Sequence, residues 1–309
     1  MKKLNNKTLG IVLVLLVVVF GATKLFRASD NSNLQSELIR LDTAQITRMV
    51  IFPQAQGHRQ LTLLRKAGRW QAIQGNRAVP ARGGTVRALL GTLAYVGVKR
   101  VVTRNKSDWK DYHMTDSLAT RLQVYAGDRL LLDCRIGALS EGTGPYAQTA
   151  TYVRLDSAAT VYQTEGYLAA TANKGFNSWR NHDFLKVDPA TVTRLQFKYP
   201  ADQGFTVQKQ DSLWKIGNRM ADSTRMAAYL NKLRSREMSD FADGFTPDRE
   251  PSMSLDIQAA GAVRIAAWPS DSGWVLQSSL RPGVYFYDRD SSAVKALLVH
   301  KDALLPPAP

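Results

Sequence analysis

The sequence predicts an α+β protein with an N-terminal transmembrane helix followed by two tandem related modules. Each module is expected to consist mainly of antiparallel strands with one amphipathic helix. Three observations predict this architecture: a long apolar run near the N-terminus, short runs of alternating apolar and polar residues beyond it, and a nine-residue pattern that occurs twice. At 309 residues the chain is long enough for two domains with separate cores.

An apolar run with a single charged residue, Lys24, extends over residues 8–26 and follows three lysines within residues 1–7. Its first sixteen residues would span roughly 24 Å as a helix, and Leu25 and Phe26 extend it toward the thickness of a bilayer core. Lysines that precede a first membrane helix keep the N-terminus in the cytoplasm. The sequence therefore predicts a cytoplasmic tail at 1–7, an uncleaved anchor at 8–26 and a soluble part beyond the membrane.

A cleaved signal peptide is the competing interpretation of the same run. Cleavage requires small residues in an A-x-A-like arrangement, and the nearest match, at residues 19–21, contains Val19 and Phe20. This poor match favours the uncleaved anchor. A polar stretch follows at 27–40 and is predicted to be a linker.

The internal repeat relates residues 41–49 to residues 187–195, with four identities and three further apolar matches in nine positions. The similarity continues in order along the chain, because Trp70 is answered by Trp214. Two apolar stripes with i, i+3, i+4, i+7 spacing then predict one amphipathic helix in each module: Val86, Leu89, Leu90 and Leu93 in the first, and Met226, Tyr229, Leu230 and Leu233 in the second.

Thr85 and Asp222 are the predicted N-caps of these two helices, because threonine and aspartate side chains accept hydrogen bonds from the first helical N–H groups. The repeat and its spacing predict a first module at 41–176, a second at 177–299 and a flexible tail at 300–309. The first module is longer, with extra residues near 103–114 and in the glycine-rich loop 137–145. Such loops carry specific function or arise by neutral drift, and the sequence does not decide between these.

Several short motifs carry a resemblance to a known family: Asp108-Trp109-Lys110-Asp111-Tyr112, a strand that ends at Ile136-Gly137, the strand Tyr152–Leu155, and Trp179-Arg180-Asn181. In this order after an apolar helix, they resemble the family catalogued as domain of unknown function 4340. The resemblance implies a membrane-anchored bacterial protein, encoded beside ABC transporter components of the gliding-motility type. It carries over no catalytic residues. A glycine is usual after the position of Tyr112, where this chain has His113.

No pattern of catalytic or metal-binding residues is recognisable in the sequence. The four histidines are scattered, none at the i, i+4 spacing of a helical metal pair. His182 and Asp183 are adjacent, but neighbours in a strand point to opposite faces, so they are not expected to act together. The single cysteine, Cys134, lies in an apolar run and is expected to be a buried hydrophobe. We therefore expect no enzyme activity, no cofactor, no metal and no nucleic-acid partner.

The basic residues are concentrated in the first third of the chain. Residues 1–110 contain 19 Lys and Arg against 4 Asp and Glu, whereas residues 111–309 contain 22 of each kind. Beyond a membrane, the available polyanions are lipid head groups, polysaccharides and acidic proteins. An ordinary solvated surface is the equally weighted alternative. The candidate basic interaction surface comprises Arg65, Lys66, Arg69, Arg82, Arg87, Lys99 and Arg100.

Anchor, repeat, charge and resemblance together lead to three hypotheses. The first is a non-enzymatic accessory or scaffold protein of a bacterial envelope complex, associated with an ABC-type exporter. It would be a single-pass protein of the inner membrane, with its soluble part in the periplasm. The alternative is a binding module for an anionic envelope ligand, a lipid head group or a polysaccharide. A hydrolase of envelope polymers is third, because no paired carboxylates stand in a recognisable frame.

Overall fold

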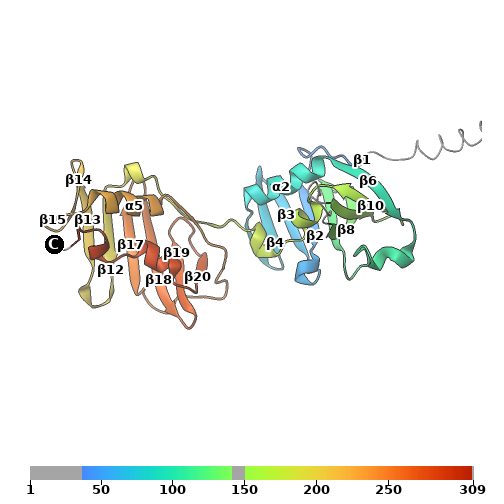
Figure 1. Cartoon of the computed structure of the whole chain (residues 1–309). Helices are drawn as coiled ribbons and strands as arrows, with labels where there is room; N and C mark the ends of the chain where they lie inside the picture. Colours follow the sequence, from blue (N-terminus) through green and yellow to red (C-terminus); the bar gives the residue numbers. More distant parts are fainter. Residues whose placement is uncertain (1–36, 141–149, 308–309) are drawn as a thin grey trace, which may run out of the picture. The chain divides into compact units, whose positions relative to one another are not determined.

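The computed structural model describes residues 37–140 and 150–307, and the predicted anchor at 8–26 lies outside this range. The chain divides into two compact units between Trp179 and Arg180 (Figure 1). Both are mixed α+β with mostly antiparallel sheets, as the sequence predicts. In the described part of the chain, no helix combines the length and the apolar character needed to cross a membrane.

The first unit is built on a ten-stranded sheet in the order β1-β6-β10-β9-β8-β7-β2-β3-β4-β5. Its strands are β1 (Glu37–Ile39), β2 (Arg48–Phe52), β3 (Leu61–Lys66), β4 (Arg69–Gln74), β5 (Arg77–Pro80), β6 (Val96–Thr103), β7 (Thr120–Ala126), β8 (Arg129–Ser140), β9 (Ala150–Leu155) and β10 (Val161–Glu165). Its α-helices are α2 (Gly83–Ala94), α3 (Leu168–Ala172) and α4 (Phe176–Trp179), and two short 3-10 helices are η1 (Gln54–Gln56) and η2 (Lys106–Lys110).

The strands of this sheet bury one face under the helices. In β7, Leu122 and Val124 belong to the hydrophobic core, whereas Arg121 and Gln123, which alternate with them, face the opposite side. This period of two is what a sheet with one covered face requires. The predicted stripe of α2 completes the core, since Val86, Leu89 and Leu93 are fully buried and Leu90 packs against them.

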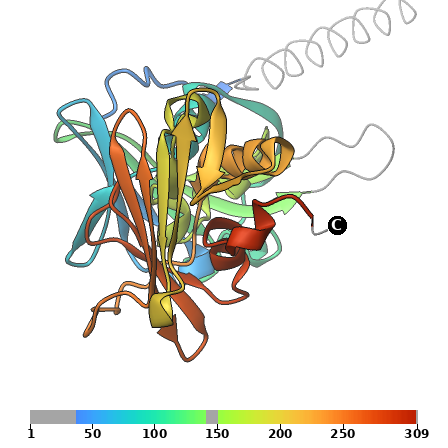
Figure 2. The same ribbon diagram turned by 90° about the vertical axis from the view of Figure 1, so that its left-hand side faces the viewer.

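The second unit contains an eight-stranded sheet in the order β15-β14-β13-β12-β17-β18-β19-β20 and a separate pair, β11 with β16. The strands are β11 (Asp183–Lys186), β12 (Arg194–Lys198), β13 (Phe205–Gln210), β14 (Leu213–Ile216), β15 (Arg219–Met220), β16 (Ser235–Glu237), β17 (Met253–Gln258), β18 (Ala262–Ser270), β19 (Gly273–Ser278) and β20 (Tyr285–Asp288). The helices α5 (Ser223–Leu233) and α6 (Ser292–Leu297) cover one face of this sheet (Figure 2), and the short 3-10 helices are η3 (Pro189–Thr191), η4 (Pro200–Asp202) and η5 (Lys301–Ala303).

Eight strands of the first sheet have counterparts in the second in the same spatial and sequential order, from β10-β9-β8-β7-β2-β3-β4-β5 to β20-β19-β18-β17-β12-β13-β14-β15. Individual backbone hydrogen bonds also recur. The N–H of Arg65 donates to Thr47 O and the N–H of Lys209 to Thr193 O, both at the start of a hairpin. The N–H of Ala81 donates to Trp70 O and the N–H of Ala221 to Trp214 O. These bonds establish which positions of the two units are equivalent.

The helix starts differ between the units. Asp222 is the N-cap of α5 as predicted, and its carboxylate accepts a hydrogen bond of 2.8 Å from Arg225 N. The prediction of Thr85 for α2 is wrong: the N-cap is Arg82, three residues earlier, its side chain makes no capping bond, and the helix starts at Gly83. The Thr85 hydroxyl donates instead to Ser178 O at 3.4 Å. The preference of threonine for the N-cap position did not predict this helix start, because the Thr85 hydroxyl bonds a residue that is distant in the sequence.

Three predicted boundaries also need correction. The linker was expected to reach residue 40, but Ile39 in β1 is 3 % exposed and belongs to the core. The two units separate after Trp179, three residues beyond the predicted boundary. The flexible tail was expected from residue 300, but Leu304 and Leu305 are buried in the second core and their carbonyls accept hydrogen bonds from Asp222 N and the Arg225 guanidinium. Leu304 and Leu305 directly precede the Pro-rich end of the sequence and form part of the second core.

Cys134 is fully buried on the core face of β8, and burial raises the pKa of its thiol to about 12. We expect no reaction with a thiol reagent in the folded protein at neutral pH, because both the thiolate form and access are suppressed. Titration with 5,5′-dithiobis(2-nitrobenzoate) checks this: one thiol should react in denaturant and none in buffer. Rapid reaction in buffer would mean that the first unit opens locally.

Candidate interaction surfaces

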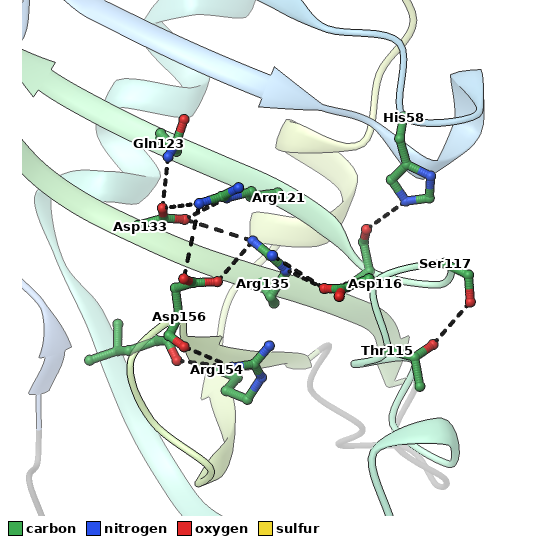
Figure 3. Close-up of polar contacts among 12 residues, drawn as sticks. His58, Thr115, Asp116, Ser117, Arg121, Gln123, Asp133, Arg135, Arg154 and Asp156 are labelled. Atoms are coloured by element: carbon green, nitrogen blue, oxygen red, sulfur yellow. Dashed lines mark hydrogen bonds and ion pairs between the residues drawn. The ribbon is translucent and has the colours of Figure 1, made fainter. Parts of the chain in front are cut away.

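The face of the first sheet opposite its α-helices carries a row of three arginines. Arg121 pairs with Arg135 across β7 and β8, and Arg135 pairs with Arg154 across β8 and β9. Directly paired residues of neighbouring strands project from the same face, so the three guanidinium groups lie side by side (Figure 3). The Arg121 side chain is 34 % exposed, that of Arg135 12 %, and Arg154 is 4 % exposed, so burial increases along the row from β7 to β9.

Three aspartates compensate the charge of this row. The Asp133 carboxylate accepts from Arg121 Nε at 3.0 Å and Nη2 at 2.6 Å, and from Gln123 Nε2 at 2.7 Å. Arg135 lies 3.1 Å from an Asp156 oxygen and 3.2 Å from an Asp116 oxygen (Figure 3). Arg121 and Arg135 are thus ion-paired with the three aspartates, and Arg154 joins them through its hydrogen bond to the backbone carbonyl oxygen of Asp156. The six residues Arg121, Arg135, Arg154, Asp116, Asp133 and Asp156 are called the ion-pair network here.

Arg154 anchors the turn that follows β9. Its Nη1 donates to the carbonyls of Leu155, Asp156 and Ala158 at 3.4, 3.1 and 3.1 Å. The guanidinium carbon also lies 4.0 Å from the ring centre of Trp109 in η2, a cation–π contact. The segment around η2 is thus fastened to the network, and the Trp109 indole donates to Ala159 O at 3.1 Å.

The pKa of Asp133 describes the state of the network. Burial opposes its charged form, but the hydrogen bonds from Arg121 and Gln123 and the nearby guanidinium charges outweigh burial, so its pKa is lowered. The hydrogen bond to Asp133 in turn raises the pKa of Arg121, although burial opposes this. A carboxylate held in its charged form suits an ion pair and not a general acid at neutral pH.

The counterparts of the arginine row in the second unit are uncharged. Arg48 pairs with Tyr125 in the first unit, and Arg194 pairs with Gln258 in the second, so Tyr125 and Gln258 are equivalent positions. Four residues earlier in each strand, Arg121 is therefore equivalent to Ser254. Ser254 pairs with Ala266, which pairs with Gln277. The network is therefore a property of the first unit and not of the shared strand order.

The second unit instead has a groove of about 530 Å³ on the corresponding face, lined mainly by β12, β17 and β18. Arg194, Asp256 and Arg264 lie along it, with Asp256 3.7 Å from Arg264 and 3.2 Å from Lys198. In the first unit the position of Gln258 is occupied by Tyr125, whose ring lies 4.2 Å from the Arg48 guanidinium.

The structure separates the predicted basic surface into two groups. Arg65, Lys66 and Arg69 are exposed at the tip of the β3–β4 hairpin. The hydrogen bond from Ala81 N to Trp70 O brings the start of α2, with Arg82 and Arg87, beside this hairpin. The group at the hairpin and the start of α2, called the basic hairpin surface, thus comprises Arg65, Lys66, Arg69, Arg82 and Arg87.

Lys99 and Arg100 do not join the basic hairpin surface. They lie in β6, which is six positions from β3 in the hydrogen-bonded order of the sheet, on the opposite side of the unit in Figure 1. Arg100 Nε donates to Gln163 Oε1 at 2.8 Å. Clustering along the sequence therefore did not correspond to clustering in space.

The remaining sequence candidates are placed as follows. His182 is 8 % exposed while Asp183 is exposed, so the two side chains point apart as expected. Among the described residues, no group of three or more His, Cys, Asp or Glu could hold a metal ion. His113 has φ of 54°, a left-handed conformation that glycine adopts without strain. The arginine row was not predicted from the sequence, where its sole signal is the alternation of polar with apolar residues in β7 and β8.

Comparison with known proteins gives one match. The family model described as "Domain of unknown function (DUF4340)" matches residues 70–257. No curated protein and no solved structure matches the chain. The matched region covers most of the first unit, including the strands that carry the ion-pair network, and the second unit as far as β17. Because this match spans more than half of the sequence, the chain belongs to the DUF4340 family.

Proposed function

We propose that this protein is a non-enzymatic accessory or scaffold protein of a bacterial envelope complex, associated with an ABC-type exporter. Residues 8–26 anchor it in the inner membrane, and its soluble part lies in the periplasm. The basic hairpin surface of the first unit docks an acidic face of a protein partner. An anionic lipid or polysaccharide is the alternative ligand for the same surface.

The observation that carries this proposal is the pairing of like charges at the hairpin tip. Lys66 and Arg69 are direct cross-strand partners, separated by a two-residue turn in which Ala67 and Gly68 have φ of 48° and 76°. Like charges directly opposite each other destabilise a strand pair. Within the described part of the chain, neither side chain has a carboxylate partner. The free protein thus keeps an unfavourable charge arrangement that an acidic partner would relieve.

The second unit supports this interpretation by contrast. The positions equivalent to Arg65, Lys66 and Arg69 are Lys209, Gln210 and Leu213, because Lys209 repeats the hydrogen bond of Arg65 and Trp214 that of Trp70. The second hairpin lacks the paired cations although its backbone is built in the same way. We propose that the two units are related modules with a shared framework, and that docking specialised in the first.

The role of the basic hairpin surface is tested by changing Arg65, Lys66 and Arg69 to glutamate in the full-length protein. With on the order of 1 kcal/mol per contacting charge, the affinity for an acidic partner should fall roughly 100-fold or more at low salt. The measurement is co-purification of transporter subunits from gently solubilised membranes, quantified by mass spectrometry and repeated at raised ionic strength. The wild-type association should weaken with salt, because exposed charges are screened.

The matched control places glutamate at Lys209, Gln210 and Leu213, the same three positions of the second hairpin. This variant should retain the partner. Equal loss in both variants would contradict a role specific to the first unit. Retention of protein partners by the Arg65, Lys66 and Arg69 variant, combined with lost binding to anionic vesicles or polysaccharide, would establish the alternative ligand instead.

A further inference from the structure

The described chain starts at one corner of the first unit. Glu37 in β1 pairs with Gly97 in β6, so the described chain begins beside the start of β6. The Tyr95 ring lies against Gly97, since a Cβ atom built at Gly97 would be 3.3 Å from the ring. Arg40 lies 5.7 Å from the centre of the same ring. The point of chain entry is therefore flanked by Tyr95.

Tyr167 lies at the same end of the sheet. β10 runs antiparallel to β6 with Thr164 opposite Val98, so the end of β10 lies beside the start of β6. The Cβ position at Gly97 is also 3.5 Å from Glu165 Oε2, two residues before Tyr167. Tyr95 is 51 % exposed and Tyr167 59 %. We call this region the entry corner, defined by Glu37, Arg40, Tyr95, Glu165 and Tyr167.

We propose that the entry corner rests in the head-group layer of the phospholipid membrane, with Tyr95 and Tyr167 inserted between the lipids. This inference rests on the proposed function in so far as residues 8–26 form the membrane anchor. Tyrosine is favoured at membrane interfaces because its ring is apolar and its hydroxyl remains hydrated. Two exposed rings beside the point of chain entry are placed for this contact.

The length of the predicted tether brings the entry corner within reach of the membrane. Residues 27–36 separate the predicted anchor from Glu37. Ten residues span at most about 36 Å even when fully extended, so the corner cannot lie farther than this from the end of the predicted anchor.

The entry corner carries one positive and two negative groups, which distinguishes it from the basic hairpin surface. Arg40 is paired with Glu37 at 2.8 Å, and Glu165 adds a further negative group. Attraction to anionic lipid therefore contributes little. The contact should persist in zwitterionic bilayers and at high salt, in contrast to the association of the hairpin with its partner.

The test uses the full-length protein in phosphatidylcholine nanodiscs, with Tyr95→Cys and Tyr167→Cys introduced singly and labelled with the polarity-sensitive fluorophore NBD. Leu213→Cys is the matched control, because Leu213 is a 52 % exposed apolar residue of the second unit. Buried Cys134 should stay unlabelled, and its protection reports that each variant is folded. We expect blue-shifted emission and quenching by nitroxide-labelled lipid at positions 95 and 167 but not at 213, unchanged at high salt.

The outcomes separate this inference from the proposed function. If labels at 95 and 167 are quenched by aqueous iodide as strongly as the label at 213, while the chain still floats with vesicles, the corner is solvated and the inference fails alone. If both labels are shielded from iodide yet not quenched by labelled lipid, a protein covers the corner and the inference also fails. If the protein does not float with vesicles, residues 8–26 do not anchor it in a membrane, and the proposed function fails together with this inference.

Discussion

Changing Asp133 to alanine is expected to lower the free energy of unfolding of the protein by about 3 kcal/mol. Asp133 is 12 % exposed at its side chain and accepts hydrogen bonds from Arg121 and Gln123, and its removal leaves Arg121 without its closest carboxylate. An uncompensated, partly buried guanidinium group is costly because it has lost water as well as its partner. Urea denaturation followed by circular dichroism measures the change.

Asp128 provides the control for this prediction. It lies in the turn of the same β7–β8 hairpin, is exposed, and has no ion pair within the described part of the chain. Asp128→Ala should change stability by less than about 0.5 kcal/mol. An equally small effect of Asp133→Ala would mean that the network is a solvated surface and not a partly buried one.

The pH dependence of the Asp133→Ala difference has a defined sign. The pKa of Asp133 is lowered in the folded protein, so its contribution is present above the ordinary carboxyl pKa of about 3.9 and is lost as the pH falls through the folded value. The stability difference between wild type and Asp133→Ala should therefore be constant from pH 8 to pH 5 and should shrink below about pH 4. A difference that grows in acid would contradict this account.

Changing Gly137 to alanine is expected to be of similar magnitude, about 3 kcal/mol, for a steric reason. An added Cβ would overlap the backbone carbonyl oxygen of Tyr112 and would lie 2.8 Å from Met114 Cε and 3.2 Å from the carbonyl oxygen of His113. Backbone atoms cannot rotate away as a side chain can, so β8 or the segment after η2 must shift. Thermal unfolding by calorimetry would record the loss.

Gly91→Ala is the corresponding control, because a Cβ at Gly91 meets nothing within 4 Å and Gly91 lies inside α2. This change should stabilise the protein by up to about 1 kcal/mol, since alanine favours the helix over glycine. If Gly137→Ala proved neutral, the close approach between β8 and the Tyr112 backbone would not be a fixed feature of the fold. The opposite signs expected for the two substitutions make the comparison sensitive.

The sequence alone determined the features that depend on local periodicity. The apolar stripes at 3.6-residue spacing located α2 and α5, and seven of the eight stripe residues are buried, with Leu90 packing at the edge. Alternation with a period of two predicted strands, and the repeated nine-residue pattern marked two stretches that lead into β2 and β12, which have the same place in the two sheet orders. Burial of one face imposes such patterns on neighbouring residues, so they can be detected without a structure.

The tertiary structure decided everything that depends on pairing between distant strands. The register of β7, β8 and β9 aligns Arg121, Arg135 and Arg154, which are separated in the sequence by 14 and 19 residues. The same sheet order separates Lys99 and Arg100 from the other predicted cations. Register and strand order arise from contacts summed over the whole sheet, and a side chain gives no local sign of the residue that it will face across a strand.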